Sequence, residues 1–136
     1  LTAGGCSIKM SSNKVQKIRE RIDKTFYEYN QSVSKTPKRA AKNILLRMKF
    51  LTGNTRLYNS KSKAFVGIYF SNRFITDLSD LSGLDAYLSN KINGLQDQKL
   101  KKRISRFSFK KGFEDKIFRK FTFIEFSDIS KGWSHV

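Results

Sequence analysis

The sequence is poor in the residues that usually bind metals or form cross-links. It has one cysteine, Cys6, and one histidine, His135, among 136 residues. A single cysteine excludes a disulfide within the chain, and no cluster of cysteine and histidine exists that could hold zinc. No run of about 18 apolar residues is present, so the sequence predicts no membrane-spanning segment. We therefore expect neither a bound metal nor another cofactor.

Acidic residues are also scarce. The chain has 11 aspartates and glutamates against 28 lysines and arginines, which gives a formal net charge of +17. Two segments, between Glu28 and Asp77 and from Gln98 to Phe113, contain many basic residues and no acidic one. Basic residues without neighbouring counterions attract a polyanion, so we expect nucleic acid as the partner, RNA rather than DNA.

The aromatic content argues against a disordered basic tail. Hydrophobic residues make up 38% of the chain, including 12 phenylalanines, 5 tyrosines and 1 tryptophan, which is enough to fill one core. We expect residues 1–12 to be a flexible leader or processing segment and residues 13–136 to form a single basic domain. The chain begins without methionine, which favours a product released from a longer protein. Small residues precede Cys6 as in lipoprotein signals, but the charged and apolar segments that such a signal needs are missing.

Apolar periodicity predicts three helices. Apolar residues recur at spacings of three and four over residues 13–33, with Asn13 as the expected N-cap. Pro37 suits the first turn of a second helix, over residues 37–51, which Gly53 ends. A third apolar stripe runs from Leu78 to Leu95 after Thr76 or Asp77, and Gly83 favours its division into a short and a longer helix.

Two hairpins complete the predicted fold. Residues 55–58 and 64–70 are rich in β-forming residues around a polar turn, and the second strand is expected to continue through Phe74 and Ile75. Residues 105–110 and 117–126 are predicted to pair around a turn at 112–115. The sequence therefore predicts an α+β fold in the order ααββαββ, with N-terminal helices followed by antiparallel hairpins and an intervening helix.

Two kinds of side chain are candidates for contact with nucleic acid. Exposed rings can stack on unpaired bases, and Tyr58, Tyr69, Phe74 and Phe113 are candidates for this role. Basic residues on the second helix and in the second predicted hairpin, where Arg106, Lys110, Arg119 and Lys120 are expected to share a face, can neutralise phosphates. The predicted phosphate-binding set is Lys38, Arg39, Lys42, Lys49, Lys101, Lys102, Arg103, Arg106, Lys110, Lys111, Arg119 and Lys120.

A catalytic site is harder to predict, because no motif specifies one. A metal-independent ribonuclease must activate a 2′-hydroxyl, stabilise charge on phosphorus and protonate the leaving oxygen. It does not strictly need histidine, because lysine, arginine, tyrosine, serine, threonine or carboxylate side chains can share these roles. Clustering around the first hairpin, together with the only histidine, gives the candidate catalytic set of Arg56, Tyr58, Lys61, Lys63, Tyr69, Arg73 and His135. A weaker alternative is a magnesium site at Glu114-Asp115-Lys116 with Asp97 or Asp85.

These observations favour a protein that acts on nucleic acid. The specific hypothesis is a small metal-independent ribonuclease of the effector or toxin type, released from a longer chain, which acts in the cytoplasm after delivery or secretion. The alternative is a non-catalytic RNA- or DNA-binding protein associated with ribosomes or the nucleoid. A basic membrane-surface or lipid-anchored protein is a third hypothesis. An acidic inhibitor or immunity protein is a further expected partner, because a negatively charged protein readily blocks a basic groove.

Overall fold

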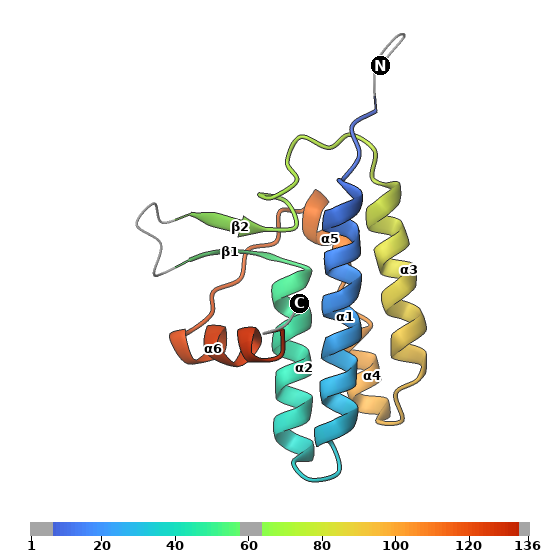
Figure 1. Cartoon of the computed structure of the whole chain (residues 1–136), viewed down its shortest axis with the longest axis vertical. Helices are drawn as coiled ribbons and strands as arrows, with labels where there is room; N and C mark the ends of the chain where they lie inside the picture. Colours follow the sequence, from blue (N-terminus) through green and yellow to red (C-terminus); the bar gives the residue numbers. More distant parts are fainter. Residues whose placement is uncertain (1–6, 58–63, 134–136) are drawn as a thin grey trace.

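Two long helices begin the fold, and both were predicted. The computed structural model describes residues 7–57 and 64–133. In it α1 spans Ser12–Ser32 and α2 spans Pro37–Leu51 (Figure 1). The hydroxyl of Ser11 accepts a hydrogen bond from the amide of Lys14 and caps α1, so the cap lies before the predicted Asn13. Pro37 begins α2 at a position where a backbone N–H has no helical partner.

The first predicted hairpin is present, but its strands are short. β1, Asn54–Arg56, pairs antiparallel with β2, Phe65–Gly67, and Arg56 lies opposite Phe65. The predicted extension of the second strand through Phe74 and Ile75 is wrong, because the chain turns after Gly67. Gly67 has a φ of 137°, which other residues rarely adopt, and a Cβ there would collide with the carbonyl oxygen of Gly53.

The third predicted helix, α3, spans Ser79–Asn93. It continues through Gly83 without a break, so the predicted division into two helices is wrong. Asp77, one of the two predicted caps, accepts a hydrogen bond from the amide of Ser79, although the N-cap position itself is Leu78. This bond and burial of the apolar stripe outweigh the weak helix propensity of a single glycine.

The second predicted hairpin is not present. Its place is taken by two short helices, α5, Phe109–Glu114, and α6, Phe123–Lys131, and a further short helix, α4, Gln98–Ile104, precedes them. Helices and one antiparallel hairpin still make this an α+β fold, but the order of the described elements is α1, α2, β1, β2, α3, α4, α5, α6, and not ααββαββ.

Side-chain caps explain why these segments are helical. The alternation around Phe107 and Phe109 suggested a strand, but the hydroxyl of Ser108 accepts a hydrogen bond from the amide of Lys111 and begins α5. Thr122 and Glu125 form a reciprocal capping box at the start of α6. Local capping therefore overrides the apparent period of two.

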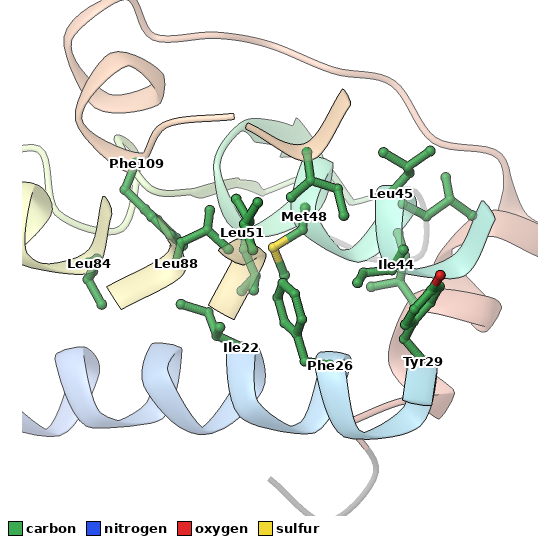
Figure 2. Close-up of a cluster of buried hydrophobic side chains, with 14 of the residues drawn as sticks. Ile22, Phe26, Tyr29, Ile44, Leu45, Met48, Leu51, Leu84, Leu88 and Phe109 are labelled. Carbon is green, nitrogen blue, oxygen red and sulfur yellow. The ribbon is translucent and has the colours of Figure 1, made fainter. Parts of the chain in front are cut away.

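The core lies where α1, α2, α3 and α5 meet. Figure 2 shows Ile22 and Phe26 of α1 directed towards Met48 of α2, with Leu88 of α3 and Phe109 of α5 beside them. These side chains are at most 5% exposed. Residues before α1 also join the fold: the backbone of Ile8 accepts hydrogen bonds from the amides of Thr76 and Asp77, and Met10 is buried.

Candidate nucleic-acid interface

The basic residues of the two acid-free segments, 29–76 and 98–113, make no ion pair with an acidic side chain in the described structure. Residues 7–57 and 64–133 contain three ion pairs: Lys9 with Asp77, Lys24 with Glu28, and Lys91 with Asp23. None of the three lysines belongs to either segment. Most basic side chains of the segments are instead exposed to solvent, namely Lys35, Lys38, Arg39, Lys42, Arg56, Arg73, Lys99, Lys102, Arg103, Arg106, Lys110 and Lys111, whereas Lys49 and Lys101 are half-buried.

Arg47 is the exception, because it is buried and supports the fold. Its guanidinium donates to the carbonyl oxygens of Asp128, at 2.9 Å, and Ile129, at 3.4 Å, near the end of α6. Gly132 lies against this guanidinium, and a Cβ there would collide with it. Burial lowers the pKa of Arg47. A cation that binds the last carbonyls of a helix complements its dipole, so Arg47 holds α6 against α2.

Arg119 also supports the fold, although we predicted it to bind phosphate. It donates to the carbonyl oxygen of Lys49, at 2.9 Å, and to the hydroxyl of Thr52, at 3.3 Å, at the end of α2. Burial lowers its pKa. The strand pair that was expected to align Arg106, Lys110, Arg119 and Lys120 does not exist; the other three side chains are exposed on helical or irregular segments.

A groove between α3 and α4 lies beside part of the basic surface. Its volume is about 590 Å³, and its lining includes Lys101, Lys102, Gln98 and Ser105 together with one acidic residue, Asp85. The lysines, amide and hydroxyl groups can bind the oxygens of a phosphate or a sugar, whereas the carboxylate of Asp85 repels an anion that lies next to it.

Exposed aromatic rings gather on one side of the hairpin. Phe65 is 50% exposed and Phe118 is 45% exposed, and the centres of their rings are 6.1 Å apart. The ring of Phe70 lies 5.2 Å from Phe65 and 5.3 Å from Tyr69. Figure 1 shows the hairpin projecting from the helices, with the chain from α5 to α6 passing beside it. We call the group of Phe65, Tyr69, Phe70 and Phe118 the hairpin aromatic surface.

Two cations lie over these rings. The guanidinium carbon of Arg56 is 5.9 Å from the ring centre of Phe65, and the ammonium nitrogen of Lys116 is 4.8 Å from that of Tyr69. Neither cation makes an ion pair with a described residue. Lys116 has a φ of 50°, an uncommon conformation for a lysine.

Asn54 positions the segments that carry the aromatic surface. Its buried side chain donates to the carbonyl oxygens of Gly112 and Ile117, and accepts from the amides of Tyr69, at 2.8 Å, and Phe70, at 3.3 Å. One carboxamide can make all four contacts, because its NH₂ group donates two hydrogen bonds and its oxygen accepts two. One side chain therefore joins the hairpin to two separate parts of the chain.

The predicted catalytic set is only partly described. Tyr69 belongs to the hairpin aromatic surface and Arg56 lies over its Phe65, whereas Arg73 lies over the exposed ring of Phe74 on the segment before α3. The remaining candidates, Tyr58, Lys61, Lys63 and His135, lie outside the described residues. Of the predicted stacking rings, Phe74 is 72% exposed, Phe113 is buried and Tyr58 is outside the described part.

Asp85 and Asp97, the two carboxylates proposed as upstream magnesium ligands, cap helices instead. Asp85 accepts hydrogen bonds from the hydroxyl of Ser108 and from the amide of Phe109, and so caps α5. Asp97 caps α4 through the amides of Lys99 and Leu100. Within residues 7–57 and 64–133, no group of three acidic, histidine or cysteine side chains is arranged to hold a metal ion. In the same part of the chain, no helix has the length and apolar content needed to cross a membrane.

Sequence reasoning missed three of the four rings of the aromatic surface. Phe65 had a usable signal: Val66 and Ile68 supply the inner face of the strand, so the alternation predicts that Phe65 lies on the outer face. Phe118 had no such signal, because its position depends on a parallel bridge to Asn54, far away in the sequence.

Comparisons with protein-family models, with curated proteins and with solved structures gave no match to this chain.

Proposed function

We propose that the protein binds nucleic acid, RNA in particular, through the exposed basic side chains of the two acid-free segments. The observation that carries this proposal is the absence of ion pairs from these segments within the described residues. Lysines and arginines without protein counterions are neutralised by salt ions in solution. A polyanion displaces those ions and gains free energy from their release.

RNA is favoured because rings and cations occur together. Sequence-independent RNA contacts use phosphates, whereas unpaired bases, which are common in RNA, stack on exposed aromatic rings. Phe65 with Arg56, and Phe74 with Arg73, each combine an exposed ring with a cation. Such pairs suit a nucleotide, whose base and phosphate are neighbouring groups.

Ribonuclease activity remains a separate prediction. Four of its seven residues lie outside the described part, and Arg73 contacts Phe74 rather than the aromatic surface. Both nucleic-acid binding and cleavage can be tested by incubating the protein with transfer RNA and plasmid DNA, in Mg²⁺ or in EDTA, and analysing the products on gels. RNA fragments that form in EDTA would establish metal-independent cleavage, and a shift without fragments would establish binding alone.

The test of binding is the salt dependence of affinity for a labelled single-stranded RNA. If six phosphates are neutralised, the logarithm of the association constant should fall with the logarithm of salt concentration with a slope of about −4. An affinity that does not change with salt would refute the proposal.

Variants with equal loss of charge can locate the interface. Replacing three exposed basic residues of α4 with glutamine should weaken binding at least about tenfold near 0.15 M salt, since about three phosphate contacts are lost. The residues are Lys99, Lys102 and Arg103.

The matched control removes three charges that have acidic partners. Its residues are Lys9, Lys24 and Lys91. A much smaller loss of affinity is expected, because these lysines do not belong to the acid-free segments. Equal losses in the two triple variants would show that net charge, and not a defined surface, controls binding.

A further inference from the structure

The hairpin aromatic surface contains rings in a connected series. Centre-to-centre distances of 6.1 Å, 5.2 Å and 5.3 Å join Phe118 to Phe65, Phe65 to Phe70, and Phe70 to Tyr69. Tyr69 in turn lies 5.4 Å from the buried ring of Phe113, which connects the series to the core. The outer rings are therefore exposed while the inner end of the series is fixed by packing.

The exposure of the two outer rings, Phe65 and Phe118, has no explanation in the packing of the core. Phe65 and Phe118 leave about half of their surface in water, although each ring would be more stable if buried. Arg56 and Lys116 stand beside the rings without an acidic partner among the described residues. A ligand that suits this surface must offer flat rings and negative charge together.

The ring of Tyr87 provides a contrast within the same protein. Arg19 and Lys91 lie over it, at 5.2 Å and 5.6 Å, but its hydroxyl donates to Asp23, which also pairs with Lys91. A carboxylate thus compensates the cations at Tyr87. The hairpin aromatic surface has the same combination of rings and cations without this compensation.

We infer that the hairpin aromatic surface binds unpaired bases of a single-stranded nucleic acid, with Phe65 and Phe118 as stacking platforms and Arg56 and Lys116 as phosphate contacts. This inference rests on the proposed function and specifies its substrate class. Duplexes cannot use the platforms, because their base faces are already stacked. Base stacking on a protein ring tolerates every base, so little sequence preference is expected.

Several contacts hold the rings of this surface in place before a ligand binds. Asn54 fixes the amides of Tyr69 and Phe70 and the carbonyl of Ile117 next to Phe118. Lys116 adopts an uncommon backbone conformation with its ammonium over Tyr69. Rings held in place before the ligand arrives lose less conformational entropy on binding.

The experiment compares ligands that differ only in their bases. Affinity is measured by fluorescence anisotropy for labelled oligothymidine of about 12 nucleotides, for an abasic oligomer with the same number of phosphates, and for a duplex of the same length. The wild-type protein should prefer oligothymidine to the abasic oligomer at least about tenfold, since stacking of even one base has this effect. It should also prefer oligothymidine to the duplex.

The variants test whether the rings cause this preference. Phe65→Ala with Phe118→Ala should bind oligothymidine and the abasic oligomer equally, at the affinity of the wild type for the abasic oligomer. Circular dichroism and thermal unfolding report the fold, and Phe65→Leu with Phe118→Leu keeps the apolar bulk while removing the aromatic faces. Tyr27→Ala is the matched control, because Tyr27 is an exposed ring under Lys24, a cation that pairs with Glu28, and it lies outside the series. It should retain the full preference.

The outcomes separate this inference from the proposed function. Equal wild-type affinity for oligothymidine and the abasic oligomer would overturn the stacking inference alone, and so would a preference for the duplex. The stacking inference would also be overturned if Tyr27→Ala removed the preference for oligothymidine as fully as the double variant does. Absence of binding to all three ligands at low salt would overturn the proposed function, and the inference with it.

Discussion

Buried and exposed residues of the hairpin reverse the usual distribution of side chains. Asn54 and Thr55 are polar but only 1% and 3% exposed, and Arg119 reaches the end of α2 nearby. Phe65 is apolar but half exposed, next to Arg56. Buried polar groups and exposed large apolar groups are the informative exceptions in a folded chain. Their presence in one hairpin separates two tasks: the buried polar residues fix the position of the segment, and the exposed residues are available to a ligand.

This difference also limits what a count of charges can mean. Arg47 and Arg119 contribute two of the positive charges, yet each binds carbonyl oxygens at the end of a helix. Arg56 and Lys116 contribute the same charge at places that solvent or a ligand can reach. Changes of the buried polar residues should therefore affect stability, and changes of the exposed residues should affect affinity.

The largest effect is expected for Asn54→Asp. A carboxylate would replace a donor that faces the carbonyl oxygens of Gly112 and Ile117, and would place buried charge next to them. The free energy of unfolding should fall by about 3 kcal/mol in urea denaturation at neutral pH. Asn90→Asp makes the same chemical change at an exposed position of α3 and should alter stability by less than about 0.5 kcal/mol. Similar losses in both variants would contradict the assigned role of Asn54.

Arg119→Met should have the next largest effect. It keeps most of the apolar stem but removes the hydrogen bonds to Lys49 and Thr52, so the free energy of unfolding should fall by about 1.5 kcal/mol. Lys120→Met removes one charge from the adjacent, exposed position and should leave stability nearly unchanged. Both variants should bind RNA with similar affinity. A loss of affinity confined to Arg119→Met would place Arg119 in the interface instead.

Tyr87→Phe tests the ring that has an acidic partner. Its hydrogen bond to Asp23, and secondarily burial, raise the pKa of Tyr87 above its ordinary value of about 10. The neutral hydroxyl therefore stabilises the fold below about pH 10, and this contribution is lost as the pH rises through the raised pKa. Urea unfolding should show a loss of about 1 kcal/mol for Tyr87→Phe at pH 7, and a smaller difference from the wild type near pH 11. RNA affinity should not change.

The smallest effect on stability is expected for Arg56→Met with Lys116→Met. Both side chains are exposed, so the free energy of unfolding should change by less than about 0.5 kcal/mol. If each contacts one phosphate of a single strand, the slope of log affinity against log salt should become shallower by about 1.4. An unchanged slope with a large loss of stability would contradict the role assigned to the exposed residues of the hairpin.

Long apolar periods made about half of the fold predictable. In α1, α2 and α3 they extend over many residues, and Pro37 marks the start of α2. Residues 105–126 were misassigned because short helices offer little periodicity. Ser108 alternates with Phe107 and Phe109 as in a strand, and its role as a cap depends partly on Asp85 of α3. The Thr122-x-x-Glu125 signal for α6 was present in the sequence and was not used.

The candidate site was predictable to the extent that it depends on charge. Exposed basic residues follow from the scarcity of carboxylates, and their exposure needs no knowledge of the tertiary structure. The rings of Phe65, Phe70 and Phe118 come together only through the contacts of Asn54 with residues about 15 and 63 positions away. Contacts at such separations cannot be recognised from local patterns.

The shared attachment of several amides to Asn54 has a consequence for the motions of the free protein. The backbone amides of Tyr69 and Phe70 donate hydrogen bonds to the side-chain oxygen of Asn54, and the backbone amide of Arg119 donates to the backbone carbonyl oxygen of Asn54. Breaking one of these bonds by local opening disturbs the others, so the three amide protons should exchange with deuterated solvent at similar, slow rates despite lying outside the helices. The ligand-free aromatic surface would then open as one cooperative unit rather than residue by residue.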